Sequence, residues 1–307
     1  MLERSNARRK RRMRLGKRRA AVRNRPMDLV TLRSDALVCS INPFGAELHS
    51  LTGSDGREWL WDGDPGVWSG RAPILFPIVG ALAGGSYCWQ GRRYELEKHG
   101  FARRRRFALV EQDAASATLR LSADEATRGV YPFEFELDLR FALTAALSVT
   151  ATVRNRGAGA MPFSFGFHPA LHWPRGDDAR LVFDAREDGP VWRIDDEGLI
   201  ARSEPLPGDG CTLVLDDALF ADDAMILRAV ASRGVRFDSS AGSVRLAWDN
   251  LPDLGLWTKP GAAYLCVEPW AGVNDPVGFS GEIGEKPGIV MLAPGSSWTA
   301  TMTIEPH

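Results

Sequence analysis

The strongest constraint on the fold is a strict two-residue alternation of apolar and polar side chains. In the stretch FEFELDLRF, residues 133–141, every second residue is Phe or Leu, and the residues between them are Glu, Asp or Arg. The following stretch, residues 147–154, alternates in the same way. Successive side chains of a β-strand point to opposite faces of the sheet. The pattern therefore predicts strands with one buried and one solvated face, which is typical of antiparallel sheets.

Strands of this kind recur along the chain. Residues 243–249 and 297–305 alternate as well, and turn clusters such as GSDG, NRGAG and PGDG separate the apolar runs. A helical period occurs only over residues 216–231, which predicts one short helix. The strand pattern extends from residue 29 to residue 304 without a linker or an internal repeat. We therefore predict an all-β fold, a single large antiparallel β-sandwich with one or two short helices.

Composition and cysteine spacing narrow the class of protein. Hydrophobic residues make up 44% of the 307 residues and charged residues 25%, as in ordinary globular proteins. The four cysteines are widely spaced and form no C-x-x-C, which argues against a disulfide framework and fits a reducing cytoplasm. The most apolar run, APILFPIVGALAGG, is too short to cross a membrane and is interrupted by Pro77 and Gly80. We predict a cytoplasmic location without membrane contact.

Charge is distributed very unevenly. Residues 1–25 contain twelve Lys or Arg and one acid, which leaves 26 basic and 38 acidic residues, a formal charge of −12, for residues 26–307. The basic arm, residues 1–26, is expected to be disordered. It would suit nucleic acid or an acidic surface, but the acidic body argues against nucleic-acid binding. We favour the interpretation that the arm is a non-native or dispensable extension before a single domain, residues 27–307.

Two polar residues interrupt apolar segments. His168 follows three phenylalanines in FSFGFHP and precedes Pro169, and Glu268 lies within the apolar run YLCVEPW. An unpaired buried carboxylate is costly, so its pKa tends to rise toward the range of a general base. An imidazole titrates near neutrality and is the matching general acid. A lone histidine beside aromatic residues and a partly buried glutamate are, however, each more often structural.

The remaining motifs point away from metal and nucleotide chemistry. His49 lies in an alternating segment and is expected to be structural, and Pro169 makes a regular helix carrying His168 and His172 improbable. The chain has no H-E-x-x-H, G-x-S-x-G, phosphate-binding loop or G-x-G-x-x-G after a strand. We predict no metal and no cofactor.

Four segments together resemble the aldose 1-epimerase (galactose mutarotase-like) family, in particular its shorter bacterial branch. They are SGRAPILFPIVGAL, HGFARR, MPFSFGFHPAL and LCVEPWAGVND, in this order and spacing. The resemblance covers about residues 29–305. It implies a large antiparallel β-supersandwich, in agreement with the alternation, and an isomerase that interconverts the anomers of a sugar by general acid–base ring opening.

The resemblance also implies roles for individual residues. His168 matches the histidine that protonates the ring oxygen, and Glu268 matches the carboxylate that takes the proton of the anomeric hydroxyl. His99 matches a second histidine at the sugar, and Arg71 an arginine that hydrogen-bonds the sugar hydroxyls. No metal or nicotinamide is needed for this reaction.

Aromatic residues are the candidates for stacking on the apolar face of the sugar. Trp257 and Trp270, and in addition Phe167, are considered for this role. Trp248 and Trp298 lie on inward-facing positions of predicted strands and are assigned to the core.

The identity of the substrate stays open at this point. The family uses a further acid to hold sugar hydroxyls, and either Asp249 or Asp253 is available. Arg71 and Arg103 resemble arginines that hold phosphate in the hexose-6-phosphate branch, for which an arginine fork is well suited. We place a free aldose ahead of a phosphorylated one. A non-catalytic carbohydrate-binding protein is the alternative of another class, and the chain is expected to be a monomer or a homodimer.

Overall fold

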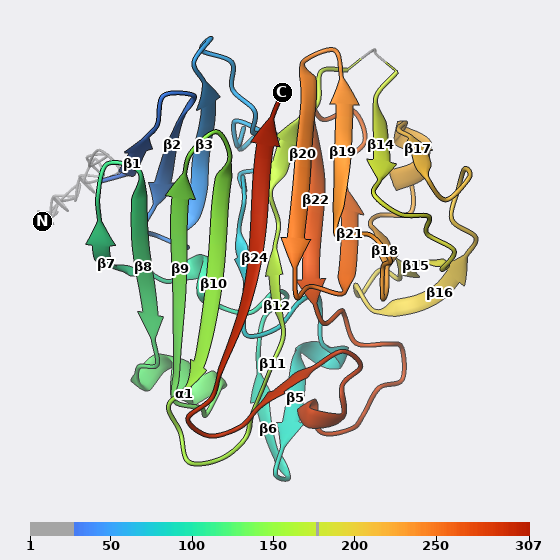
Figure 1. Ribbon diagram of the computed structural model, residues 1–307. Helices are drawn as coiled ribbons and strands as arrows, with labels where there is room; N and C mark the ends of the chain where they lie inside the picture. The colour runs from blue at the N-terminus through green and yellow to red at the C-terminus, as the bar shows by residue number, and fades with distance from the viewer. Residues whose placement is uncertain (1–27, 176–177) are drawn as a thin grey trace, which may run out of the picture.

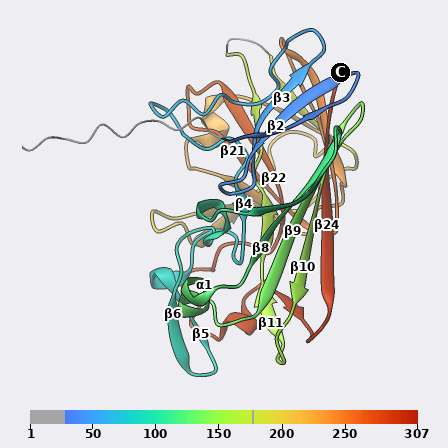
Figure 2. The ribbon, with the colours of Figure 1, turned by 90° about the vertical axis from the view of Figure 1, so that its left-hand side faces the viewer.

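Two large antiparallel sheets pack face to face in the computed structural model, which describes residues 28–175 and 178–307 (Figure 1). The basic arm, residues 1–26, and the proposed start of the domain at Met27 lie outside the described residues. The expectations about them therefore stay predictions. A view turned by a quarter turn shows the sandwich from the side, with the larger sheet in one layer and β21 and β22 in the other (Figure 2). The predicted all-β sandwich is confirmed.

The larger sheet contains the strands that the alternation predicted. Burial alternates residue by residue along β8 and β10, and β10 is buried at every second position. Its nine strands, in spatial order, are β17 (Thr212–Val214), β14 (Arg180–Phe183), β19 (Gly234–Ser239), β20 (Gly242–Asp249), β24 (Ser297–Pro306), β10 (Leu147–Asn155), β9 (Phe135–Leu143), β8 (Ser116–Ser122) and β7 (Ala108–Gln112).

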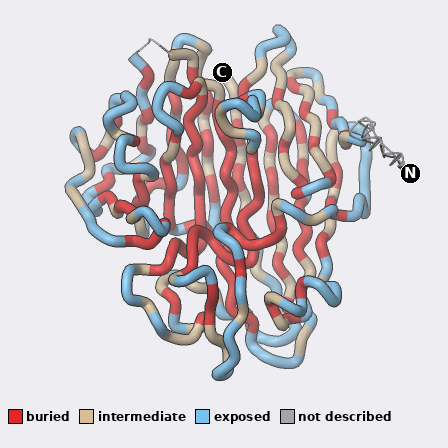
Figure 3. The backbone as a smooth tube through the Cα atoms, turned by 180° about the vertical axis from the view of Figure 1, so that it is seen from behind, coloured by how far each residue is buried: buried red, intermediate tan, exposed pale blue. Residues whose placement is uncertain are grey.

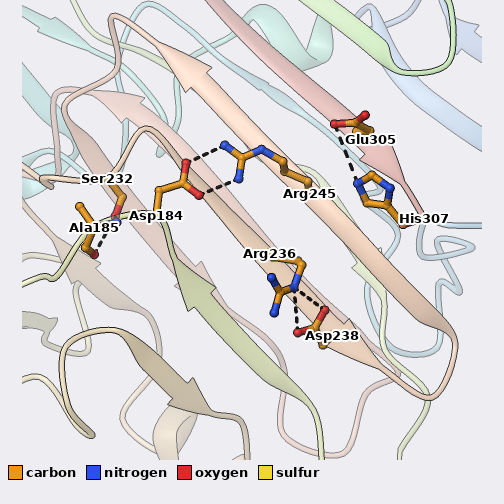
Figure 4. A network of polar contacts seen from close by, with 8 residues as sticks. All are labelled: Asp184, Ala185, Ser232, Arg236, Asp238, Arg245, Glu305 and His307. Atoms are coloured by element: carbon orange, nitrogen blue, oxygen red, sulfur yellow. Dashed lines mark hydrogen bonds and ion pairs between the residues drawn. The ribbon is translucent and has the colours of Figure 1, made fainter.

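Ion pairs occupy the solvated face of this sheet (Figure 4). Arg245 on β20 donates from both Nη1 and Nη2 to the carboxylate of Asp184 at 2.6 Å. Arg236 donates from Nε to Asp238 on the same strand, β19, at 2.9 Å. Pairs of this kind between exposed residues contribute little stability. They make the outer face of the sheet strongly polar. That face therefore stays in water, and the apolar face packs against the core.

The second sheet carries the buried strands of the molecule. All eight residues of β22 (Tyr264–Ala271) are buried, because this strand is covered on both faces. Seen from behind, the central strands are buried and the exposed residues gather in the loops around them (Figure 3). The order around β22 is β16 (Ile200–Glu204), β15 (Val191–Ile194), β18 (Met225–Leu227), β21 (Asp253–Trp257), β22, β12 (Phe165–Phe167) and β4 (Ile74–Leu75), and β13 (Ala170–His172) also pairs with β22.

Three small sheets close the ends of the sandwich. They consist of β1 (Val30–Arg33), β2 (Leu37–Asn42) and β3 (Glu47–Gly53); of β5 (Ser86–Trp89) and β6 (Arg92–Glu95); and of β11 (Met161–Phe163) and β23 (Val290–Leu292). Single 3₁₀ turns complete the structure at η1 (Ala83–Gly85), η2 (Ala102–Arg104) and η4 (Ile283–Glu285).

The predicted helix over residues 216–231 is wrong. This region forms a 3₁₀ turn, η3 (Asp217–Phe220), followed by the buried strand β18. Asp223 and Ala229 adopt positive φ values of 65° and 52°, which an α-helix cannot accommodate. The apolar spacing that suggested a helix comes from a turn and a short buried strand.

The α-helix of the described residues is α1 (Glu125–Val130), which the sequence did not reveal. Asp124 accepts a hydrogen bond from the backbone N–H of Thr127 at 2.7 Å, and the Thr127 hydroxyl accepts one from the Asp124 N–H at 2.8 Å. This reciprocal cap stabilises the first turn. Six residues are fewer than two helical turns, too few to show a period.

The sequence assigned Trp248 and Trp298 to the core, and the structure confirms this fully for Trp248 and in part for Trp298. Trp248 is buried, and Trp298 is half-buried with its ring edge-on to Phe163 at a centroid distance of 5.3 Å.

Within the part of the chain that the structure describes, no helix has the length and apolar character needed to span a membrane.

Candidate active site

Strand pairing places His168 and Glu268 opposite each other. β12 and β13 both pair antiparallel with β22, through Gly166 with Trp270 on one side and Ala170 with Cys266 on the other. His168 lies at the interruption between the two short strands, in register with Glu268 at the middle of β22. Pro169, which has no N–H to donate to the ladder, stands where the pairing is interrupted.

The two side chains are close and nearly excluded from water. His168 Nε2 lies 3.3 Å from Glu268 Oε2, and the residues are 8% and 2% exposed. The indole of Trp68 stacks on the imidazole at a centroid distance of 5.2 Å and an interplanar angle of 27°. His99 lies edge-on to His168 at 5.9 Å. The arrangement is a carboxyl–imidazole pair within aromatic walls.

Burial moves the pKa values of the pair in opposite directions. It raises the pKa of Glu268 well above its usual 4.5, an effect that the charge of Lys98 partly offsets. It lowers the pKa of His168 from 6.5 to about 3, against a backbone hydrogen bond that favours the cation. The expectation that the imidazole titrates near neutrality is therefore wrong. Burial therefore favours a protonated carboxyl group at Glu268 beside a neutral imidazole.

A cavity of about 220 Å³ opens onto this pair. Its volume lies below the roughly 300–1,000 Å³ of typical ligand pockets, which suits a ligand no larger than a single sugar ring. Six of the seven candidate residues line it: His168, Glu268, His99, Arg103, Trp257 and Trp270. These six residues lie far apart along the chain, and the fold of the second sheet and its loops brings them together.

His99 presents a hydrogen-bond donor in this cavity. The backbone N–H of Gly80 donates to His99 Nδ1 at 3.1 Å, so the proton of the neutral ring is on Nε2. Burial, with the nearby His168 and Lys98, holds the pKa of His99 well below 6.5 and keeps the ring neutral. The backbone of His99 has a positive φ of 66°, and Gly100 follows where a Cβ would lie 2.3 Å from the carbonyl oxygen of Phe76.

The two arginines have different environments. Arg103 lines the cavity, donates from Nη2 to the Lys98 carbonyl at 2.7 Å, and has a buried Nε without a partner among the described residues. Arg71 is not part of the lining, since its Nη1 donates to the His49 carbonyl at 2.8 Å and its N–H donates to the Glu47 carboxylate at 2.7 Å. The structure does not bring Arg71 to the cavity.

Trp270 forms one wall of the cavity because two neighbouring strands carry glycine. A Cβ at Gly166 of β12 would lie 2.5 Å from the indole, and one at Gly255 of β21 would lie 2.4 Å from it. Trp257 is half-buried, and Trp68 meets it edge-on at 5.4 Å. Phe167 is buried and does not line the cavity, so the stacking surfaces are those of tryptophan.

Comparison with known proteins agrees with this fold. The family model described as "Aldose 1-epimerase" matches residues 28–305. The chain belongs to the aldose 1-epimerase family. Family and fold imply an isomerase that acts on carbohydrates. The curated protein LacX (chromosomal) of Lactococcus lactis is 29% identical over 283 residues, which cover 86% of this chain and 95% of LacX.

Two solved structures are similar over nearly the whole chain. One is a galactose mutarotase related enzyme from Lactobacillus acidophilus, with 28% identity, a TM-score of 0.86, and coverage of 91% of this chain and 97% of the other. The second is a galactose mutarotase-like protein from Lactobacillus casei, with 28% identity, a TM-score of 0.87, and coverage of 91% and 100%. The galactose mutarotase-like sandwich is the fold of this family member.

Four further polar or aromatic residues line the cavity of this aldose 1-epimerase family member and escaped the sequence analysis. They are Trp68, Lys98, Asp223 and Asn274. Asn274 lies in the quoted segment LCVEPWAGVND, Trp68 comes just before SGRAPIL, and Lys98 just before HGFARR. Proximity to these segments could have identified them. Asp223 carries no such signal, since it lies in a region that was predicted to be helical.

The two acids considered for sugar binding both lie outside the cavity. Asp249 is exposed at the end of β20. Asp253 is buried, and its carboxylate accepts hydrogen bonds from the N–H groups of Ala229 at 3.1 Å and Gly272 at 3.3 Å. These contacts tie the turn after β22 to the segment before β19, so the geometry gives Asp253 a structural role.

Cys266 approaches the acid–base pair from the same strand as Glu268. One ligand atom each of His168, Cys266 and Glu268 lies within 4.8 Å of the others, an arrangement that a metal ion could use. Burial raises the pKa of the Cys266 thiol well above 9, so the sulfur is protonated at neutral pH. The absence of a metal requirement remains a prediction.

Proposed function

We propose that this protein is an aldose 1-epimerase that interconverts the α and β anomers of a hexose. The observation that carries the proposal is the contact of 3.3 Å between His168 and Glu268 at the wall of a cavity of about 220 Å³. The family relationship supports the same reaction class.

In the proposed reaction, Glu268 removes the proton of the C1 hydroxyl while His168 delivers a proton to the ring oxygen. The bond between C1 and the ring oxygen breaks, and the electron pair of the C1 oxygen forms the aldehyde carbonyl. Rotation about C1–C2 presents the other carbonyl face to the former ring oxygen. Ring closure reverses both proton transfers, so the enzyme returns to its starting state.

The pair holds the single proton that this cycle requires. Burial favours the proton on Glu268 and a neutral imidazole. Moving that proton from Oε2 to Nε2 across 3.3 Å produces the carboxylate and imidazolium that the reaction needs, with no proton taken from solvent. A sugar favours this form, because its C1 hydroxyl donates to the carboxylate and its ring oxygen accepts from the imidazolium.

The other cavity residues supply recognition. Trp257 and Trp270 offer aromatic faces for the apolar side of a pyranose. His99 donates from Nε2, and Asp223 and Lys98 supply an acceptor and a donor for hydroxyl groups. Asn274 donates its Nδ2 to the Gly198 carbonyl at 2.7 Å, which leaves its Oδ1 to accept from a sugar hydroxyl.

A hexose 6-phosphate is the second candidate substrate. The unpartnered Nε of Arg103 and the charge of Lys98 in the same cavity favour an anionic group. Asp223 in the lining opposes it, and Arg71 is bound to His49 rather than available beside Arg103. These contacts favour the free hexose.

A purely sugar-binding role fits the cavity less well. A binding protein needs hydrogen bonds and stacking, and it gains nothing from a carboxyl group that is 2% exposed against an imidazole. A buried carboxyl group in contact with an imidazole is useful to a protein that moves a proton, so the pair of Glu268 and His168 favours catalysis over binding alone.

Polarimetry on freshly dissolved α-D-glucose and α-D-galactose tests the proposal, with exchange NMR on glucose 6-phosphate in parallel. Acceleration on the free sugars supports the free-hexose epimerase. Acceleration on glucose 6-phosphate alone transfers the proposal to the phosphorylated substrate. Binding of a sugar without acceleration of any anomerisation would overturn catalysis and leave a binding protein.

A further inference from the structure

A tryptophan from a loop covers the imidazole of His168. Trp68 lies between β3 and β4, in the segment WDGDPGVWSGR, and it lines the cavity of about 220 Å³ together with His168. Its indole stacks on the imidazole with 5.2 Å between the ring centroids and 27° between the ring planes. The loop is distant in sequence from β12 and β22, so this cover is an addition to the strand pairing that brings the acid–base pair together.

Contacts within the loop hold Trp68 in this position. Its N–H donates to the Asp64 carbonyl at 2.8 Å, and its carbonyl accepts the indole N–H of Trp61 at 2.8 Å. A Cβ at Gly70 would lie 2.4 Å from the Trp68 indole, so the chain passes this close to the ring only with glycine. The loop therefore directs a half-buried aromatic ring onto His168.

Trp68 packs in a small apolar cluster that is separate from the large core between the two sheets. Its ring lies 5.4 Å from that of Trp257 and 5.3 Å from that of Tyr264. The buried members of this cluster are Trp61, Ala170, Ala262, Tyr264 and Cys266, and Val67, Trp68, Trp257 and Ala263 pack against them. The cluster therefore forms a local cover at the site rather than a part of the sandwich core.

Transfer of one proton between Glu268 and His168 needs a dry contact. Oε2 and Nε2 are 3.3 Å apart, and both residues are nearly fully buried. Water beside them would hydrate the carboxylate and the imidazolium, and it would raise the pKa of the imidazole toward 6.5. An indole face also attracts an imidazolium, but desolvation is the larger effect, since burial lowers the pKa of His168 to about 3. Loss of the cover is therefore expected to raise this pKa.

We propose that Trp68 is a positioning residue, whose indole keeps water away from His168 so that the imidazole receives its proton from Glu268 alone. The inference rests on the proposed epimerase reaction and goes beyond it, because Trp68 acts through His168 and not on the reacting atoms of the sugar. A different role, stacking of Trp68 on the sugar itself, predicts a loss of sugar affinity with no change in the titration of His168. Experiment can therefore separate the two roles.

Substitution of Trp68 removes no charge from the surroundings of His168. The titratable and charged groups near the imidazole are Glu268, Cys266 and Tyr264 on β22, His99, Lys98 and Arg103 from the segment after β6, and Asp223 before β18. Asp62 and Asp64 of the Trp68 loop are exposed. A changed titration of His168 in a Trp68 variant therefore reports access of water.

NMR titration of the full chain with isotope-labelled histidine tests the proposal without any substrate, and His168→Ala identifies the signal of His168. In wild type the imidazole is expected to stay neutral down to about pH 5, since burial lowers its pKa. Trp68→Leu is expected to bring the midpoint into the range of about pH 5–6.5. Trp68→Phe keeps an aromatic cover and is expected to restore most of the wild-type behaviour. Gly70→Ala is a second test, because its Cβ displaces the indole and should raise the midpoint as well.

Kinetics of anomerisation separate positioning from sugar binding. For Trp68→Leu we expect kcat to fall about tenfold or more, KM to stay within about threefold of wild type, and an acid limb of kcat/KM to appear near about pH 6. Trp89→Leu is the matched control, because Trp89 is half-buried on β5, packs edge-on to Phe133 and does not line the cavity. We expect it to keep both kinetic parameters and the titration of His168.

An ordinary titration of His168 near pH 6.5 in wild type, or an unchanged one in Trp68→Leu, would overturn the proposal. A raised KM with wild-type kcat in Trp68→Leu would overturn it too and would assign Trp68 to the sugar. Equal losses of kcat in Trp89→Leu would reduce the effect to general destabilisation. A wild type without activity would overturn the proposed function, whereas the NMR titration would still decide whether Trp68 shields His168.

Discussion

His168 and Glu268 face each other across antiparallel strands in one register, with Nε2 and Oε2 3.3 Å apart. The register is set by the pairs Gly166 with Trp270 and Ala170 with Cys266. A shift of the pairing by one residue would turn the glutamate to the other face of the sheet. The chemistry of the site therefore depends on the same strand pairing that holds the core together.

The buried carboxyl group of Glu268 is expected to make stability depend on pH. Its pKa in the folded protein is raised above 4.5, so its stabilising contribution is complete below pH 4.5 and is lost as the pH rises through the folded pKa. The loss is about 1.4 kcal/mol per pH unit between the two pKa values. Glu268→Gln cannot ionise, and its melting temperature should match wild type at pH 4 and exceed it at pH 8. A variant less stable than wild type at pH 8 would contradict the pKa direction.

The neutral state of His168 predicts the acid limb of the pH profile. Because burial lowers its pKa from 6.5 to about 3, the free enzyme takes up a second proton only far below pH 6.5. The ratio kcat/KM reports the free enzyme. After correction for spontaneous anomerisation, it should stay level from pH 7 down to pH 5. A fall to half near pH 6.5 would show a histidine with an ordinary pKa.

Variants of Arg103 and Arg71 should have different effects, the first on sugar binding and the second on stability. Arg103→Ala removes a charged donor from the cavity, and we expect KM to rise about tenfold or more. Arg71→Lys disturbs the contact with the His49 carbonyl outside the cavity, and we expect KM within twofold of wild type with a lower melting temperature. Steady-state kinetics and thermal unfolding of both variants check this. The reverse ranking of KM would place Arg71 at the sugar.

The glycines beneath Trp270 should tolerate no side chain. Gly166→Ala and Gly255→Ala each introduce a Cβ about 2.5 Å from the indole, and overpacking of this kind costs about 1–3 kcal/mol. We expect reduced stability together with a raised KM, because the displaced indole lines the cavity. The control is Gly129→Ala in α1, where a Cβ meets nothing within 4 Å and helix propensity favours alanine. Equal melting temperatures for the three variants would contradict the packing argument.

Much of the fold could be predicted because burial of one sheet face leaves a local trace. The alternation over residues 133–141 and 147–154 corresponds to β9 and β10, which pair with each other. The pairing of β10 with β24, far along the chain, has no such trace, since any alternating strand could take that place. Over residues 216–231 a turn and a short buried strand imitate a helical spacing.

Only part of the site could be predicted from the sequence, because only some of its residues leave a local pattern. Glu268 and His168 stand out because each interrupts an apolar run. Lys98 and Asp223 lie among other charged residues and look like ordinary surface positions until the sheet places them in the cavity. The direction of the His168 pKa also depends on burial by Trp68, which comes from a loop far from β12.

The central claim is that Glu268 and His168 together move the proton that opens the sugar ring. Polarimetry of freshly dissolved α-D-glucose and α-D-galactose tests it most directly, with wild type, Glu268→Gln, His168→Ala and the control His172→Ala, a half-buried histidine on β13 that does not line the cavity. The account predicts that each of the first two variants loses about 10²–10⁴-fold of the wild-type acceleration, while His172→Ala stays within twofold. Wild-type rates in either Glu268→Gln or His168→Ala would contradict it.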